Sequence, residues 1–203
     1  MSWTRSAVAA AALILVGGIS ASAQTPAPEN HGVRIFARGG GFNALTNLND
    51  AGSADFKKVG YSLGGGVGFQ ANKYLTLRGD FNFGRNELRT NHLVTGVKTN
   101  RYFYDAAVQL QYPFASGIEP YVFAGGGAVT IDPVGVSGTN KTRGAGTFGL
   151  GLNYQVPGSP FGVFAEGKSW VYTFRDMSGP LAGFDKTQFE LAWSGGISYR
   201  FGW

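Results

Sequence analysis

The last stretch of the chain, residues 188–203, alternates between apolar and polar side chains almost without a break. Because successive side chains of a strand point to opposite faces, this stretch predicts a β-strand with one apolar and one polar face. Its apolar face consists of Phe189, Leu191, Trp193, Gly195, Ile197, Tyr199, Phe201 and Trp203. A strand of about 10 residues or more with this division is long enough to cross a bilayer at a tilt. The pattern therefore predicts a sheet whose apolar face is turned outward, against lipid.

The N-terminus has the parts of a secretory signal. Arg5 supplies a positive charge, residues 6–19 are mostly apolar, and Ala21-Ser22-Ala23 matches an A-x-A cleavage site. The apolar run is shorter than the roughly 20 residues that a transmembrane helix needs. We therefore predict a cleaved signal peptide over residues 1–23, a flexible lead-in over residues 24–31 and one barrel domain over residues 32–203.

Turn sequences recur about every 43 residues, the length of two strands and a long loop. Short turns are expected at residues 71–73, 113–120 and 157–160. Longer polar stretches, expected to be loops, occupy residues 43–58, 87–98, 132–143 and 175–187. Three short turns and four long loops separate eight strands. Short turns on one rim and long loops on the other are typical of outer-membrane barrels.

The other predicted strands alternate as the last one does. In residues 75–83, Leu77 and Phe81 lie on the apolar face, and Arg78 and Asp80 lie on the polar face. The strand near residues 121–131 is less regular. We predict that its large apolar side chains face lipid: Tyr121, Phe123, Val129 and Ile131.

Aromatic residues gather towards the two ends of the strands, as in the interface girdles of a transmembrane barrel. The group expected near the short turns is Phe69, Tyr112, Tyr121, Tyr154, Phe161, Phe201 and Trp203. The group expected near the long loops is Tyr61, Phe83, Tyr102, Tyr104, Tyr172 and Phe189. We predict an all-β fold: an eight-stranded antiparallel up-and-down transmembrane β-barrel with short periplasmic turns and four longer extracellular loops.

Two other folds share part of this pattern. A four-bladed propeller has a similar repeat length, but each blade needs four short strands, and each repeat here contains two long ones. A soluble barrel of the lipocalin type needs an apolar interior. The polar face of these strands contains Arg78, Asp80, Glu166 and Lys168, which are costly to bury in a dry core.

Charged side chains are predicted to line the interior of this barrel. The expected network consists of Arg34, Arg38, Arg78, Asp80, Arg101, Asp105, Glu166, Lys168, Glu190 and Arg200. An eight-stranded barrel is narrow enough for side chains to fill it, and buried charges must be paired. The favoured hypothesis is a salt-bridged interior that holds the barrel together. The alternative is a small porin, in which the same residues line a narrow ion path.

No catalytic, cofactor-binding or metal-binding site is predicted. The two histidines, His31 and His92, do not belong to a cluster with metal-ligand spacing. Residues 144–149 match G-x-G-x-x-G, but a strand follows where a nucleotide-binding loop requires a helix. An enzyme remains a third hypothesis, in which His92 acts with a loop serine such as Ser178. Its test is loss of activity in His92→Ala.

The chain resembles the small outer-membrane barrels of the OmpA/OmpX class over nearly all of the mature sequence. The most specific part is residues 194–203, which look like the C-terminal signal recognised by the barrel-assembly machinery. The corresponding apolar positions are Ile197, Tyr199, Phe201 and Trp203. The family usually ends in Phe, so Trp203 is a departure from its pattern. The resemblance implies the bacterial outer membrane and roles that range from structural support and adhesion to weak channel activity.

The predicted partners follow from this location and from charge. The chain has a formal net charge of +5 and contains no Cys, so no disulfides are expected. An exported protein rarely meets nucleic acid, so nucleic acid is not an expected partner. We expect contact with outer-membrane lipid and with the phosphates of lipopolysaccharide, through basic loop residues such as Arg89 and Lys98. The four loops are also the expected place for an extracellular ligand.

Overall fold

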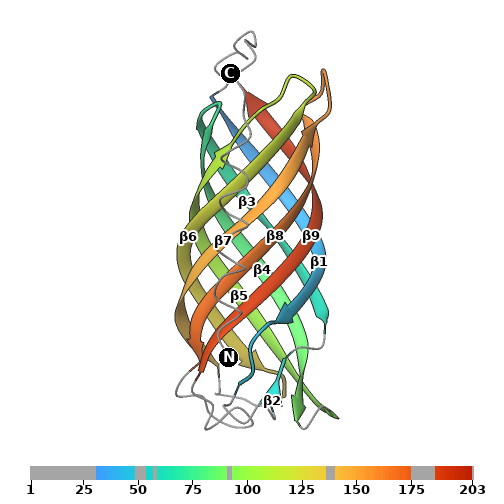
Figure 1. Ribbon diagram of the computed structural model, residues 1–203, viewed down its shortest axis with the longest axis vertical. Coiled ribbons are helices and arrows are strands. Elements are labelled where there is room, and N and C mark those ends of the chain that lie inside the picture. The colour runs from blue at the N-terminus through green and yellow to red at the C-terminus, as the bar shows by residue number, and fades with distance from the viewer. Residues whose placement is uncertain are drawn as a thin grey trace, which may run out of the picture.

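Eight long antiparallel strands form a closed barrel in the computed structural model, and their tilt is visible in Figure 1. The structure describes residues 31–48, 54–56, 59–90, 93–135, 140–174 and 186–202. The strands are β1 (Gly32–Ala44), β2 (Ala54–Asp55), β3 (Gly60–Asn72), β4 (Leu75–Thr90), β5 (Leu93–Gln111), β6 (Ile118–Pro133), β7 (Lys141–Gln155), β8 (Phe161–Phe174) and β9 (Lys186–Gly202). The predicted signal peptide and Trp203 lie outside the described residues.

The barrel closes because its first and last long strands pair. Gly32 of β1 lies opposite Gly202 of β9, and Ala44 lies opposite Glu190. Each other long strand pairs with the next along the chain, while the two-residue β2 pairs with the end of β4. A closed ring leaves no unpaired sheet edge, which is the condition for strands to cross a membrane. The predicted all-β, up-and-down fold is confirmed. No helix in the described part of the chain is long and apolar enough to span a membrane.

The three short connections lie on one rim, called here the short-turn rim, together with the start of β1 and the end of β9. They comprise residues 73–74, 112–117 and 156–160. In the first of them, the Oδ1 atom of Asn72 accepts hydrogen bonds from the backbone N–H groups of Tyr74 at 2.8 Å and Leu75 at 3.0 Å. These bonds reverse the chain within two residues, as an Asx turn does. The opposite rim is called the long-loop rim.

The second predicted long loop, residues 87–98, is wrong: most of it is strand. β4 continues to Thr90 and β5 begins at Leu93, with Glu87 opposite Lys98 and Thr90 opposite Leu93. Backbone pairing satisfies the hydrogen bonds of this extension, so its polar composition does not oppose strand formation. Polar side chains mark the part of the hairpin beyond the apolar band, rather than a change of secondary structure.

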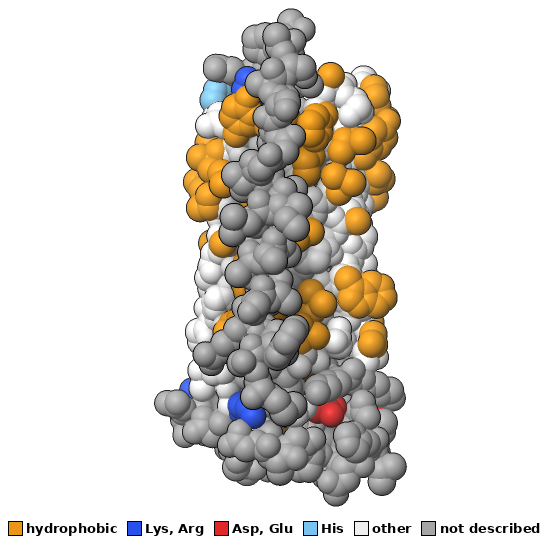
Figure 2. Space-filling view, viewed as in Figure 1, with side chains coloured by type: hydrophobic (Ala, Val, Ile, Leu, Met, Phe, Trp, Pro, Cys, Tyr) orange, Lys and Arg blue, Asp and Glu red, His pale blue; other side chains and the backbone are white. Residues whose placement is uncertain are grey.

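The outer wall of the barrel is apolar, as the alternation predicted. Leu63, Leu110 and Ile197 are 56%, 56% and 61% exposed, although all three are large and hydrophobic. On the face seen in Figure 2, hydrophobic side chains form an upper and a lower group along the wall. An apolar exterior of this extent fits a lipid environment and is rare on soluble monomers.

The facing predicted for β6 is wrong. Tyr121, Phe123, Val129 and Ile131 are 6%, 4%, 0% and 0% exposed and point into the barrel, while Val122 is 42% exposed on the outside. Glycines on the neighbouring strand leave room for two of these rings. Gly149 lies opposite Phe123 and Gly151 opposite Tyr121, and a Cβ atom at either glycine would collide with the facing ring.

Candidate functional site

In the part of the chain that the structure describes, the interior of the barrel contains three groups of charged side chains, each with a salt bridge across the full width of the lumen. Around the ring, β1 and β6, β4 and β8, and β5 and β9 are diametrically opposite pairs, each four strands apart in both directions. The bridges that join them are Arg34–Glu119, Arg78–Glu166 and Arg101–Glu190. The three groups are called the short-turn, central and long-loop clusters.

The central cluster is the largest. Glu166 accepts hydrogen bonds from Arg38, from Arg78 at 2.9 Å and from the hydroxyl of Tyr121 at 3.0 Å. Asp80 accepts from Arg38 at 2.6 Å and is held by the Nε of Arg78 at 2.8 Å. Every one of these charged side chains is buried. Burial removes water as a competitor and makes each pairing depend on the others.

Lys168 and Asp105 extend the central cluster towards the long-loop rim. The Nζ atom of Lys168 donates to Oδ1 of Asp105 at 2.6 Å and lies 3.5 Å from Oδ2 of Asp80. The indole N–H of Trp170 donates to the other oxygen of Asp105 at 3.0 Å. Three cations and three carboxylates thus compensate one another within this cluster: Arg38, Arg78 and Lys168 with Asp80, Asp105 and Glu166.

The short-turn cluster contains a carboxylate that the sequence analysis did not assign to the lumen, Glu119 of β6. It lies 2.8 Å from Arg34 of β1 and 2.8 Å from Arg200 of β9, so two cations share one carboxylate. The side-chain amide of Asn153 also donates to Glu119, at 2.9 Å. Glu119 lies on the same face of β6 as Tyr121. The sequence could have indicated this placement, because residues 119 and 121 lie on the same face of the strand and an acidic side chain on the lipid face is costly.

The long-loop cluster places one ion pair among aromatic rings. Arg101 lies 2.9 Å from Glu190, and neither side chain is exposed. The Arg101 guanidinium stacks 4.1 Å from the ring centre of Phe56, and Phe103 stacks on Trp170 with centres 4.2 Å apart. Such contacts let a cation lie in an apolar environment. Tyr172 is also inside, at 3% exposure, so its prediction as a girdle residue is wrong. Tyr121 is likewise not a girdle residue.

Residues from the first long connection cover the long-loop cluster. Leu48 and Phe56 are both 0% exposed. The backbone carbonyl of Phe56 accepts from the Asn86 side chain at 2.9 Å and from the N–H of Ala44 at 3.3 Å. The segment is therefore bonded to two strands of the barrel, and its apolar side chains close over the interior.

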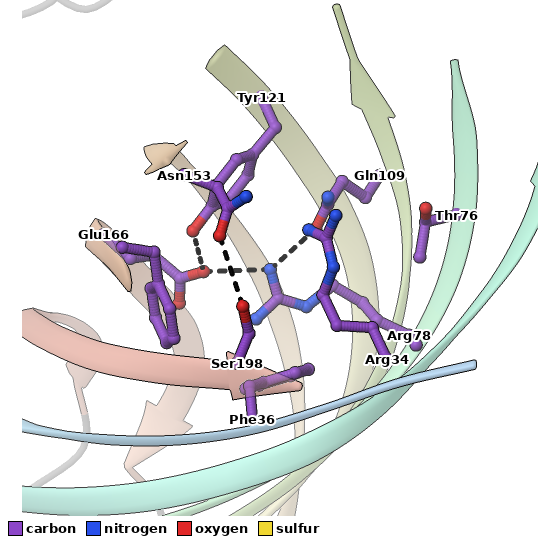
Figure 3. A pocket seen from close by; sticks show the side chains of 11 residues that line it. Arg34, Phe36, Thr76, Arg78, Gln109, Tyr121, Asn153, Glu166 and Ser198 are labelled. Carbon is purple, nitrogen blue, oxygen red and sulfur yellow. Dashed lines mark hydrogen bonds and ion pairs between the residues drawn. The ribbon is translucent and has the colours of Figure 1, made fainter. Parts of the chain in front are cut away.

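A small cavity lies between the short-turn and central clusters (Figure 3), with a volume of about 20 Å³. Arg34 reaches it from β1, Arg78 from β4 and Glu166 from β8. Its uncharged polar wall is formed by Thr76, Gln109, Tyr121, Asn153 and Ser198. The space is of the size that holds about one buried water molecule, and far below that of a pocket for an organic ligand.

Nine of the ten side chains predicted to line the lumen are buried, and the tenth, Arg200, is half-buried and pairs with Glu119. Within the described residues no group of His, Cys, Asp and Glu has the arrangement of a metal site. His31 is described and exposed, while His92 and Ser178 lie outside the described residues. At the C-terminal strand, Ile197 and Phe201 are on the outer wall, at 61% and 47% exposure. The Tyr199 ring lies at a tilt against that of Phe201, with ring centres 4.6 Å apart.

The comparisons with known proteins agree with this architecture. Residues 9–201 match the model of the outer membrane protein beta-barrel domain family. No curated protein matches the chain. Among solved structures, Neisserial surface protein A is 16% identical with a TM-score of 0.58, over 83% of this chain and 97% of that one.

Two further barrels have a similar fold. The N-terminal β-barrel domain of OprF from Pseudomonas aeruginosa is 17% identical with a TM-score of 0.51, over 85% of this chain and 99% of that one. Ail of Yersinia pestis, solved with the heparin analogue sucrose octasulfate, is 14% identical with a TM-score of 0.50, over 85% and 99%. Identities this low indicate the fold alone. With the family match over nearly the whole sequence, the chain belongs to the outer membrane protein beta-barrel domain family and is a protein of the bacterial outer membrane.

Proposed function

We propose that the protein is a non-enzymatic barrel that acts through its outer surface and loops, in a structural or surface-interaction role, and that its lumen is closed to ions. The observation that supports this most is the set of three salt bridges between opposite walls. An ion crossing the lumen would have to break each bridge in a nearly dry interior, where separating paired charges is costly. A small porin is the alternative, and ion conductance distinguishes it: the closed lumen passes no stable single-channel current.

The proposed partner in the outer leaflet is lipopolysaccharide, and two described basic residues support this proposal. Arg85 of β4 has the outward parity of Phe81 and Phe83, and its guanidinium lies 5.9 Å from the Phe83 ring centre. Lys98 is exposed on the neighbouring strand β5. Both lie on the long-loop side of the outward aromatic residues Phe83 and Tyr104. Basic side chains just beyond an aromatic girdle are suited to anionic headgroups.

The double variant Arg85→Gln/Lys98→Gln is therefore expected to bind lipopolysaccharide about 30-fold more weakly, at about 1 kcal/mol for each basic group removed. The measurement is a titration of refolded protein with lipopolysaccharide micelles at fixed ionic strength. Lys73→Gln is the matched control, because it removes one positive charge at the short-turn rim. Equal affinities for the double variant and the wild type would contradict this partner.

We also propose that the outward face of β9, with Ile197, Tyr199 and Phe201, is together with the terminal residue Trp203 the segment that the barrel-assembly machinery recognises. The apolar surface of Ile197 and Phe201 supports this, since it is accessible before lipid surrounds it. Phe201→Ser should reduce the amount of folded barrel in the outer membrane while leaving refolding of the purified protein in detergent unchanged. An equal amount in the membrane would argue against the assignment.

A further inference from the structure

The side-chain charges that the structure describes in the short-turn and central clusters do not balance. Within these two clusters the cations are Arg34, Arg38, Arg78, Lys168 and Arg200, and the carboxylates are Asp80, Asp105, Glu119 and Glu166. The central cluster is neutral, so the additional positive charge lies in the short-turn cluster, where Arg34 and Arg200 share Glu119. Both arginine side chains are largely buried, at 11% and 15% exposure. A positive charge removed from water without a partner is strongly unfavourable, and a counter-ion relieves it.

The cavity in Figure 3 is where such a counter-ion fits. Two of its lining residues, Arg34 and Arg78, are cations, and one, Glu166, is an anion. The Glu166 oxygens already accept hydrogen bonds from Arg38, Arg78 and Tyr121. Arg34, by contrast, uses its Nη2 atom for Glu119, and a guanidinium has five N–H donors.

The remaining wall of the cavity suits an anion as well. The amide groups of Gln109 and Asn153 line it, and each has a second N–H donor beside the one that it gives to Gln111 or Glu119. The hydroxyl groups of Thr76 and Ser198 complete the polar wall and donate to Gln111 and Asn153. A volume of about 20 Å³ admits one particle close to the size of a water molecule and excludes polyatomic organic anions. The salt bridges of the central cluster lie on the long-loop side of the cavity, so an anion would enter from the short-turn rim, where Arg34 and Arg200 keep 11% and 15% exposure.

We propose that the lumen holds one small monovalent anion of the size of chloride in this cavity, bound by the N–H donors of Arg34 that Glu119 does not use, with the charge of Arg78 beside it, as the counter-ion of the short-turn cluster. The site is closed towards the long-loop rim, so it is a binding site and not part of a conduction path. Because the unfolded chain lacks the site, anion binding stabilises the folded barrel by mass action.

The test measures stability while chloride replaces gluconate at constant ionic strength. For the refolded full chain, the urea midpoint should rise by about 1 M by the time chloride reaches about 100 times its dissociation constant. The ³⁵Cl resonance should broaden in the presence of protein and sharpen again when bromide is added. Two results together would overturn the proposal: a urea midpoint that does not change with chloride, and a ³⁵Cl linewidth that does not change when protein is added. The cavity would then hold water.

Two variants locate the effect. Arg34→Gln removes the additional charge, and Gln109→Glu adds a carboxylate beside Arg78, whose Nη1 atom lies 3.0 Å from the Gln109 oxygen. Each variant should abolish the dependence of the urea midpoint on chloride. Gln109→Glu remains informative if Arg34→Gln does not fold. Arg85→Gln is the matched control, because it removes a positive charge from the outer wall and should leave the dependence unchanged. Chloride dependence that persists in both lumen variants, or is lost in the control, would place the anion elsewhere.

Discussion

Glu166→Ala is expected to lower the free energy of unfolding by about 3 to 5 kcal/mol. The Glu166 carboxylate accepts from Arg38, Arg78 and Tyr121, which come from three different strands. Its removal leaves two buried guanidinium groups to compete for Asp80 and leaves the Tyr121 hydroxyl without its acceptor. An uncompensated buried charge is far more costly than the net value of the original pair.

The measurement is equilibrium unfolding in urea of the refolded protein in detergent, with gel mobility before and after heating as the check that the barrel folds. Lys98→Ala is the control, since it removes an exposed side chain and should change stability by less than about 0.5 kcal/mol. If the two variants unfold at the same urea concentration, the central cluster does not hold the barrel together as described.

Val67→Arg is expected to lower the free energy of unfolding in a lipid bilayer by about 2 to 4 kcal/mol. Val67 is 49% exposed on the outer wall and lies near the middle of β3. An arginine there must remain charged in hydrocarbon or extend to an interface. The measurement is unfolding from lipid vesicles, and Val67→Leu is the control because it keeps the surface apolar. If Val67→Arg loses no more stability than Val67→Leu, this face of the barrel does not contact lipid.

Strand number, strand order and the facing of most strands follow from the sequence because period-two alternation is strong where one face meets lipid. In β9 and β4, apolar and polar residues hardly mix, so the assignment of faces is unambiguous. In β6 the signal is weak. Gly125, Gly126 and Gly127 occupy both faces of its centre, and the large apolar residues Tyr121 and Phe123 belong inside because glycines of β7 face them.

The ionic part of the lumen is predictable because charged residues have few other places in a membrane barrel. Its aromatic part is not, since an inward ring in a small barrel depends on which residue of another strand leaves space for it. Trp170 stacks on Phe103, and Phe42 meets Phe103 edge to face, so the three rings come from three separate strands. That arrangement depends on the barrel's stagger, which no single strand encodes. Glu119 was missed because the facing of β6 was reversed.

Single-channel recording in planar bilayers tests the closed lumen most directly. Refolded wild-type protein is inserted from detergent, and current is followed over a range of voltages in potassium chloride. The three cross-lumen salt bridges predict a protein that inserts without producing stable current steps. Stable steps whose size changes in Glu166→Gln or Lys168→Gln would contradict this account, because they would show that ions pass through the central cluster.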